Sequence, residues 1–401
     1  MTLGTRCSVT FRRASARPST VAGRPAAGPA LLRAPLRRSL LGILAVSILG
    51  CGTGRSRRAE SVPVEQLPLA ADTLVVPFTN LPEVAWLGGR RWAVVGADHD
   101  AVVVADFGSK TVTPLGGPKN PELAKPFGVF AVGDTAFIAD WGKTRTSIWS
   151  VDGKLVGAIP APSQLRGILA KARDAAGQLY FEVPPIAGPD GSGLKDSAAV
   201  VRSDPGLTRF DSLARLAPLD IAEITEQRGK RYERYVFSGN DWWGVRPDGG
   251  LWIARVRLNR VVTVRDGKER RGEPLPDPVL DVTRADREHY LSTFPPELRS
   301  MAEKLPFAAI KPPFERALPG TEGEVWLRKS RPVRDSLRRY HVIDTAGMLS
   351  RVFTTIGNGV IAAVGRDAAL ITEQFRDGVR LMEVRIPAPP VPADSARRSG
   401  S

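Results

Sequence analysis

Residues 125–159 read KPFGVFAVGDTAFIADWGKTRTSIWSVDGKLVGAI, and this stretch decides the fold. Short apolar segments are separated by turn-forming pairs such as Gly133-Asp134 and Asp152-Gly153. Asp accepts hydrogen bonds from turn backbone, and Gly adopts the positive φ that tight turns need. The stretch therefore predicts four short strands joined by turns, which is one small antiparallel sheet.

The turn and the strand that follows it recur along the whole chain. The six copies are Gly89-RRWAVVGAD, Asp134-TAFIAD, Gly177-QLYFEV, Gly250-LWIARV, Gly323-EVWLRK and Asp367-AALITE. Their starts are separated by 45, 43, 73, 73 and 44 residues. Intervals near 44 match one four-stranded propeller blade, and the longer ones match a blade with an insertion. The pattern predicts an all-β protein with six propeller blades.

The two ends of the repeat array are complementary. The last copy lacks an outer strand, because the chain becomes rich in proline from Pro387. A spare strand, Thr73-LVVPF, precedes the first copy. Pairing this strand with the last blade closes the ring and leaves no open sheet edge. We therefore expect a propeller over residues 71–387, closed by an N-terminal strand.

Residues 125–159 also resemble a known repeat. They match the NHL repeat, a propeller blade with a Pro-x-Gly-Val opening, an apolar-Ala-Asp centre and an Asp-Gly turn. The chain after the first 50 residues is similar to the six-bladed, NHL- or TolB-like propeller proteins of bacterial envelopes. This resemblance implies a fold, and it implies no particular reaction.

The predicted loops differ between the two faces of the propeller. We label the strands of each blade A to D from the centre outward, so the A–B and C–D turns share one face. The B–C and D–A links share the other, which we call the looped face. All long insertions fall there, at residues 184–197, 217–240, 277–313 and 330–338. Long loops on a rigid scaffold usually carry binding residues.

The insertion at residues 277–313 is expected to contain two short helices. Thr283 is placed to cap the first, and Pro295-Pro296 opens the second, where proline is tolerated. Their apolar side chains are expected to pack onto the propeller, where the insertion acts either as a fixed plug or as a moving gate. These residues are Tyr290, Leu291, Leu298, Met301 and Leu305.

Polar residues end the B strands at the looped face, where they form the candidate ligand-binding site. The residues at these ends are Asp98, Asp140, Glu182, Arg255, Lys329 and Glu373. Trp141 and Trp242 lie beside them, and flat aromatic side chains suit sugars or peptide segments. His99, next to Asp98, is the one histidine positioned as a base. The same charges are equally compatible with a ring of ion pairs, so no catalytic residue and no metal ligand is assigned.

The segment before the propeller resembles a bacterial lipoprotein signal. Residues 40–51 read LLGILAVSILGC behind Arg37-Arg38, which gives a basic flank, a short apolar core and a cysteine. The run is too short to span a bilayer as a helix. We expect residues 1–50 to be a signal peptide with an extended basic region, Cys51 to be lipidated, and 51–70 to be a flexible linker. Residues 388–401 are expected to be a disordered tail.

Composition narrows the functional classes. The net charge is +15, but eight arginines precede the apolar run, so the chain from Cys51 carries only +7, and this excess is scattered. A nucleic-acid binder concentrates its positive charge, so no nucleic-acid partner is expected. Cys7 and Cys51 are the only cysteines. Cys7 lies in the expected signal peptide and Cys51 is the expected lipidation site, so no thiol is left for a disulfide or a nucleophile. No cofactor is predicted.

Two functional hypotheses follow. The first is an envelope-anchored binding or scaffold module that contacts a protein or glycan through the looped face. Lipid on Cys51 is expected to hold it on the periplasmic side of the outer membrane, since Gly52 rather than Asp follows the cysteine. The alternative is a lactonase-like, cation-dependent hydrolase or lyase acting on a small polar substrate. In that case Asp98, Asp140 and Asn240 are among the oxygen donors.

The lipidation hypothesis gives a direct test, because the two cysteines provide a matched pair. In bacteria expressing the full chain, Cys51→Ser is expected to abolish incorporation of radiolabelled palmitate and to release the protein from the membrane fraction. Cys7→Ser is expected to retain both label and membrane association. Label that persists in Cys51→Ser contradicts the assignment.

Overall fold

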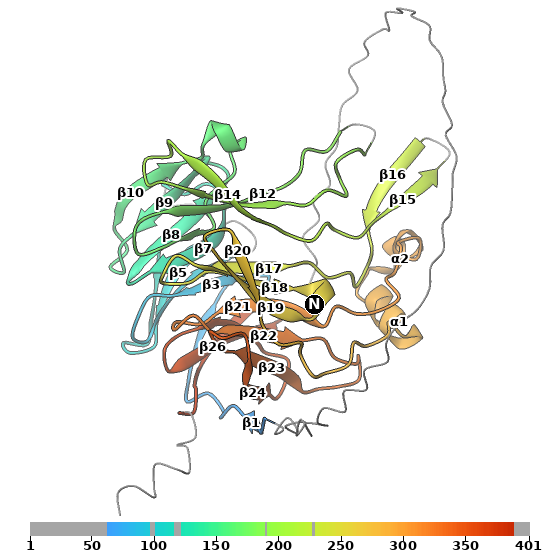
Figure 1. Cartoon of the computed structure of the whole chain (residues 1–401). Helices are drawn as coiled ribbons and strands as arrows, with labels where there is room; N and C mark the ends of the chain where they lie inside the picture. Colours follow the sequence, from blue (N-terminus) through green and yellow to red (C-terminus); the bar gives the residue numbers. More distant parts are fainter. Residues whose placement is uncertain (1–61, 97–100, 116–121, 189–190, 227–228, 389–401) are drawn as a thin grey trace, which may run out of the picture. The chain divides into compact units, whose positions relative to one another are not determined.

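A computed structural model describes residues 62–388 except 97–100, 116–121, 189–190 and 227–228. The expected signal peptide, Cys51, Asp98 and His99 lie outside these residues. The described chain forms six blades, each built on four antiparallel strands, which confirms the predicted six-bladed propeller (Figure 1). The innermost strands contact one another in a closed circle, in the order β3, β7, β11, β17, β21, β25 and back to β3.

Each blade follows the A-to-D order. Blade 1 contains β3 (Glu83–Trp86), β4 (Arg91–Val95), β5 (Val102–Asp106) and β6 (Thr111–Pro114), and blade 2 contains β7 (Pro126–Val132), β8 (Thr135–Asp140), β9 (Arg145–Trp149) and β10 (Leu155–Pro160). Blade 3 contains β11 (Ala172–Arg173), β12 (Leu179–Val183), β13 (Ala199–Ser203) and β14 (Phe210–Arg215), and blade 4 contains β17 (Trp242–Val245), β18 (Leu251–Arg255), β19 (Arg260–Arg265) and β20 (Lys268–Arg271). Blade 5 contains β21 (Phe314–Pro319), β22 (Val325–Lys329), β23 (Arg338–Ile343) and β24 (Leu349–Thr355), and blade 6 contains β25 (Val360–Val364), β26 (Ala368–Phe375), β27 (Gly378–Arg385) and β2 (Asp72–Val76).

The apolar core is divided among the six seams between blades. Each cluster packs side chains of two neighbouring blades together, as where Trp326 and Phe353 of blade 5 meet Ile371 of blade 6, although blade 2 gives only partly buried side chains to its cluster with blade 3. Central strands such as β8 are buried on both faces, which explains why they are apolar at nearly every position. Burial of apolar surface at these seams provides the main driving force for the ring.

An N-terminal strand closes the ring, as predicted. β2 is the outer strand of the last blade and pairs antiparallel with β27. A further strand, β1 (Val64–Gln66), pairs parallel with β24 of blade 5, and Arg351 bonds the Glu65 carboxylate at 2.7 and 3.0 Å. Residues 64–66 fall in the expected flexible linker, so that expectation is corrected here: an ordered strand begins at Val64.

The Asp-Gly turns behave largely as the sequence predicts. Asp106 accepts from Gly108 N at 2.7 Å, and Asp344 accepts from Ala346 N and Met348 N, both at 2.9 Å. Asp204 accepts from several backbone N–H groups, of which that of Arg209 contributes most to lowering the pKa of the carboxyl. These aspartates fold the turns on the face opposite the looped face.

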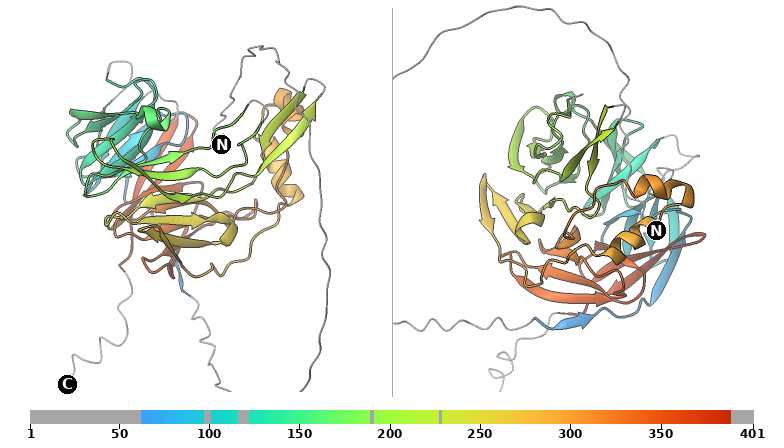
Figure 2. Two further views of the ribbon diagram at one scale, coloured as in Figure 1. Left: turned by 45° about the horizontal axis from the view of Figure 1, so that its top comes forward. Right: turned by 90° about the vertical axis from the view of Figure 1, so that its right-hand side faces the viewer.

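The insertions lie on the looped face, and two of them join. Residues 221–234 form a separate hairpin of β15 (Ile221–Glu226) and β16 (Gly229–Arg234), which the sequence analysis did not predict. The helical insertion contains α1 (Arg284–Ser292) and α2 (Pro296–Ala302), and Thr283 caps α1 as expected. Figure 2 shows hairpin and helices side by side. Two 3-10 turns, Ser163–Leu165 and Val256–Leu258, complete the elements.

The helices are held mainly by the neighbouring insertion. Tyr290 of α1 packs edge-on against Phe237, which follows β16, with ring centroids 5.8 Å apart. Phe307 contacts both rings. Met301, expected to pack onto the propeller, is 44% exposed. The two insertions therefore pack against each other on the looped face. None of the described helices has the length and apolarity to cross a bilayer.

The seam between blades 6 and 1 gives a stability prediction. Glu383 of β27 is buried, and its carboxylate accepts from Arg90 Nε at 2.5 Å and Trp92 Nε1 at 3.0 Å, both on blade 1. Glu383→Gln is expected to lower the free energy of unfolding by about 1–3 kcal/mol, because Arg90 loses the buried one of its two charged acceptors and keeps only Asp72, at 2.7 Å. Urea unfolding monitored by tryptophan fluorescence measures the change.

The matched control is Glu373→Gln in the adjacent strand, whose partner Arg380 lies 2.9 Å away. This pair is solvent-exposed, so its loss is expected to cost less than about 1 kcal/mol. Equal losses in the two variants contradict a special role for the closing seam.

Candidate functional site

The looped face carries most of the exposed apolar surface. Fourteen large apolar side chains are exposed in the described part of the chain, and nine of them lie in B–C or D–A links. These nine are Trp141, Ile186, Leu219, Leu258, Val279, Met301, Ile310, Leu337 and Ile356. The opposite face is formed by short turns. Exposed apolar groups gathered on one face are typical of an interaction surface.

Asp140, at the end of β8, is a fully buried structural anchor. Its Oδ1 accepts from Lys125 N at 2.8 Å and from Gly142 N at 2.9 Å. Its Oδ2 accepts from Ala124 N at 2.8 Å. The carboxylate thus joins the link entering blade 2 to the turn after β8, and its oxygens face backbone rather than the surface.

Trp141, the next residue, is the exposed aromatic group that the sequence predicted beside this strand end. It is 51% exposed, and its ring stacks on Phe127 of the innermost strand with centroids 5.4 Å apart and planes at 24°. The stacking holds the indole in place while one of its faces stays accessible. A fixed, half-exposed indole suits contact with a sugar ring or an apolar side chain.

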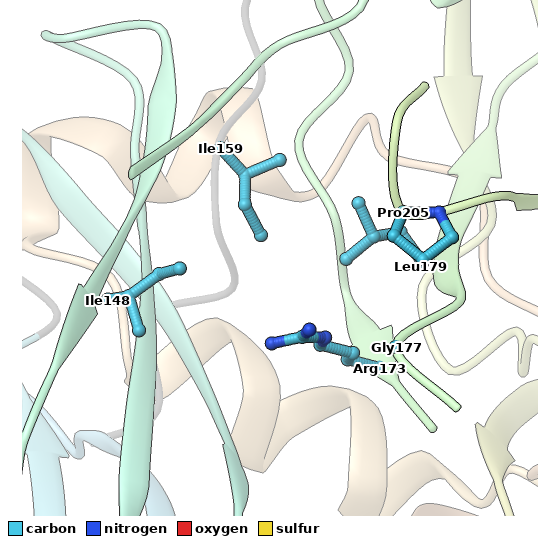
Figure 3. Close-up of a pocket in the computed structure, with 6 residues that line it drawn as sticks. All are labelled: Ile148, Ile159, Arg173, Gly177, Leu179 and Pro205. Atoms are coloured by element: carbon cyan, nitrogen blue, oxygen red, sulfur yellow. The ribbon is translucent and has the colours of Figure 1, made fainter. Parts of the chain in front are cut away.

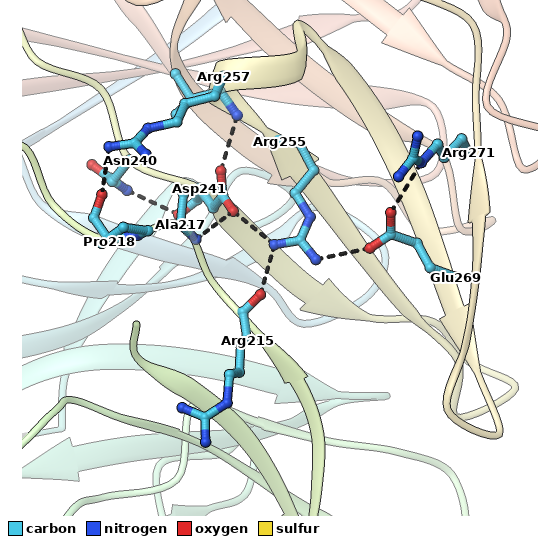
Figure 4. Close-up of polar contacts among 10 residues, drawn as sticks. Arg215, Ala217, Pro218, Asn240, Asp241, Arg255, Arg257, Glu269 and Arg271 are labelled. Carbon is cyan, nitrogen blue, oxygen red and sulfur yellow. Dashed lines mark hydrogen bonds and ion pairs between the residues drawn. The ribbon is translucent and has the colours of Figure 1, made fainter. Parts of the chain in front are cut away.

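Arg255, at the end of β18, belongs to a network at the root of the hairpin insertion (Figure 4). Its guanidinium bonds Asp241 Oδ2 and Glu269 Oε2, each at 2.9 Å, and the carbonyl of Arg215 at 2.7 Å. The buried Asp241 also accepts from Ala217 N at 2.8 Å. Both ends of residues 217–241 are therefore fastened to blade 4. The sequence analysis missed Asp241, which precedes a strand instead of ending one.

Lys329, at the end of β22, is only 7% exposed and sits in a buried charged cluster with Asp277 and His341. Asp277 Oδ2 lies 2.9 Å from His341 Nε2 and 3.6 Å from Lys329 Nζ. Contact with His341, opposed by burial and aided by Lys329, lowers the pKa of Asp277 to about 2. Burial lowers the pKa of Lys329 in spite of Asp277. The cluster fastens the link that leads to the helices.

The remaining candidates are also engaged locally. Glu182 accepts from Lys171 Nζ at 2.7 Å and from Trp243 Nε1 at 2.8 Å. Glu373 pairs with Arg380, as described above. Trp242 is partly buried beneath Arg316, whose guanidinium carbon lies 4.8 Å from the ring centroid. Asn240 Oδ1 accepts from Arg234 at 3.2 Å.

The structure therefore does not bring the described strand-end residues together around one point. Each has its own neighbours, and none of them pairs with another of the set. Among the described residues, no three His, Cys, Asp or Glu side chains converge as a metal site would require. Asp98 and His99 lie outside the described residues.

The cleft in Figure 3 is small and lies between blades 2 and 3. Ile148, Ile159, Arg173, Gly177, Leu179 and Pro205 line its roughly 80 Å³. Two of these residues, Gly177 and Pro205, belong to A–B and C–D turns, and the others lie on strands. Ligand pockets usually enclose about 300–1,000 Å³. This cleft is therefore smaller than a usual ligand pocket.

These features define the chain as a six-bladed β-propeller with one elaborated face. No protein-family model and no curated protein matches it. A DUF4221 member from Bacteroides vulgatus aligns with 80% of this chain and 98% of its own, at 10% identity and a TM-score of 0.47. Virginiamycin B lyase from Staphylococcus aureus aligns with 79% of this chain and 99% of its own, at 7% identity and a TM-score of 0.41. A gluconolactonase from Xanthomonas campestris aligns with 80% of this chain and 95% of its own, at 12% identity and a TM-score of 0.41. Such distant similarities carry no argument about activity.

The Asp277 cluster predicts a pH-dependent stability. The folded-state pKa of Asp277, about 2, lies below the ordinary value of 3.8, so its ionised form stabilises the fold at pH values above about 4. Asp277→Asn is expected to lower the free energy of unfolding by about 2 kcal/mol at pH 7 and by roughly half as much at pH 3. Urea titrations at a series of pH values measure the difference.

Asp220→Asn is the control, because Asp220 forms a solvent-exposed pair with Arg257 at 2.6 Å on the same face. Its loss is expected to cost less than about 1 kcal/mol at neutral pH. A penalty for Asp277→Asn that stays constant from pH 7 to pH 3 contradicts the low pKa.

Proposed function

We propose that this protein is a binding or scaffold module of the bacterial envelope, which engages a protein or glycan partner through its looped face. The observation that carries the proposal is the segregation of exposed apolar side chains. Most of them lie in the B–C and D–A links, while the short turns of the opposite face carry Met348 alone among the exposed large apolar side chains of the described residues. A ring of rigid blades holds these links in fixed positions, as binding loops require.

The engagement of the charged side chains supports binding over cation-dependent hydrolysis. A cation site needs several free oxygens directed at one point. Asp140 directs its oxygens at backbone N–H groups, while Glu182 and Glu373 each face a cationic side chain. Arg255 and Lys329 stand at corresponding strand ends and oppose a cation there. The exposed Trp141 provides apolar contact area for a partner, and binding through such a surface requires no catalytic residue.

The placement in the cell is a separate part of the proposal. The lipoprotein-like segment ending at Cys51 supports attachment to a membrane, and Gly52 supports the periplasmic side of the outer membrane. Several acyl chains, rather than one, make such an anchor durable. An anchored propeller leaves its looped face available to partners in the envelope.

Site-specific photo-crosslinking in living cells tests the binding function. A photoreactive amino acid at Trp141 or Ile186, both on the looped face, is expected to give discrete crosslinked products. The same amino acid at Val156, on an outer strand, is the control, because its exposure of 62% is similar to that of Trp141. Crosslinks of equal yield at all three positions, or at none, overturn the proposal.

A further inference from the structure

One stretch of the looped face has an unusual charge. Residues 328–339 read RKSRPVRDSLRR and contain six basic residues and a single acidic one, Asp335. The stretch covers the end of β22, the B–C link of blade 5 and the start of β23. Asp335 offsets only one of the six positive charges, and its carboxylate accepts from the backbone N–H of Leu337 at 2.8 Å. The surrounding charge is therefore strongly positive.

Strand pairing gathers three of these side chains on one side of the sheet. Arg328 is opposite Tyr340 in the antiparallel β22–β23 pair. Continuing this register past the strand end places Ser330 opposite Arg338. Residues 328, 330, 338 and 340 then share a face of the sheet. Tyr340 is buried in the core between blades 5 and 6, so this face is turned toward blade 6.

These three side chains have unused hydrogen-bond donors. Arg328 Nε, Ser330 Oγ and Arg338 Nε are buried, and none has a hydrogen-bond partner among the described residues. Arg328 forms an ion pair with Glu315, whose Oε2 lies 3.2 Å from Arg328 Nε, but this contact lacks the geometry of a hydrogen bond. Arg338 Nη2 donates to the carbonyl of Asn358 at 3.1 Å. Buried donors without acceptors are costly, so this arrangement favours an incoming acceptor.

The cations in this group also crowd one another. Burial, followed by the nearby charges of Arg331 and Arg328, lowers the pKa of Arg338. Arg331 itself donates to the carbonyl of Asp335, a contact that leaves its positive charge unbalanced. A negatively charged group placed here gains both hydrogen bonds and charge compensation. The planar guanidinium matches a carboxylate with two parallel bonds.

We propose that Arg328, Ser330 and Arg338 form an oxyanion site that receives a carboxylate side chain of an acidic polypeptide partner. The inference deepens the proposed binding function and rests on it. A polypeptide is favoured because exposed apolar groups adjoin the cations: Leu337 is in the same link, and Ile356 is two residues from Asn358. A segment that alternates acidic and apolar residues satisfies both features.

Binding of a model peptide to the detergent-solubilised full-length protein tests the site. The probe is a fluorescein-labelled peptide of six Glu-Leu repeats, and fluorescence anisotropy gives its Kd. Arg338→Gln is expected to raise the Kd about tenfold, since one charge-assisted bond is worth about 1.4 kcal/mol or more. Arg338→Lys keeps the charge without the planar fork and is expected to give an intermediate value. Circular dichroism verifies that both variants fold.

Arg265→Gln is the matched control, because Arg265 forms an exposed pair with Asp248 near the opposite face. It is expected to change the Kd less than twofold, and a Gln-Leu peptide is expected to bind at least tenfold more weakly than the Glu-Leu peptide. Equal effects of the two arginine variants, equal binding of the two peptides, or no binding of the Glu-Leu peptide overturn the proposal.

Further outcomes distinguish failure of this site from failure of the proposed binding function. Arg338-dependent binding to phosphatidylglycerol vesicles, without binding of the Glu-Leu peptide, replaces the polypeptide with a membrane surface and overturns the proposal. Crosslinks that persist at Trp141 and Ile186 while the peptide fails to bind refute this site but leave the proposed function standing. Loss of both results refutes both.

Discussion

The pairing of β2 with β27 is the contact on which the rest of the structure depends. It joins residues near positions 74 and 381 and makes the ring continuous. Without it, blade 6 lacks its outer strand and exposes a sheet edge, which is prone to pair with other chains. Glu383 strengthens the same seam by accepting bonds from two blade 1 side chains. A rigid ring follows from closure, and fixed loop positions follow from the rigid ring.

The two faces use their polar residues differently. Asp106, Asp204 and Asp344 fold tight turns on one face. On the looped face, buried acids fasten long links to the blades: Asp140 holds the link into blade 2, and Asp241 holds the hairpin insertion. Residues that looked like ligands in the sequence therefore include several that hold the long links in place. Exposed indole and aliphatic groups lie on the same face, and they carry the proposed binding function together with the blade 5 arginines.

The sequence predicted the blades better than the site. The repeated turn-and-strand unit is visible because packing between blades imposes the same apolar strands and turns on each copy. The hairpin of β15 and β16 was missed because it is rich in charged residues, and Ile221 and Ile224 do not alternate as strand residues usually do. The partners of Asp140 and Arg255 could not be predicted, because they come from links whose paths depend on the folded ring. The six basic residues of 328–339 are visible in the sequence. Which of them share one face of blade 5 follows only from the β22–β23 register.

The short strand β1 has a mechanical consequence. Because β1 precedes β2 in the chain, any tension applied before Val64 reaches the pairing of β1 with β24 first. The two strands are parallel, and the bidentate contact between Arg351 and Glu65 adds to their three paired positions. The force therefore acts first on blade 5, and β2, which closes the ring, bears tension only after β1 has separated from β24.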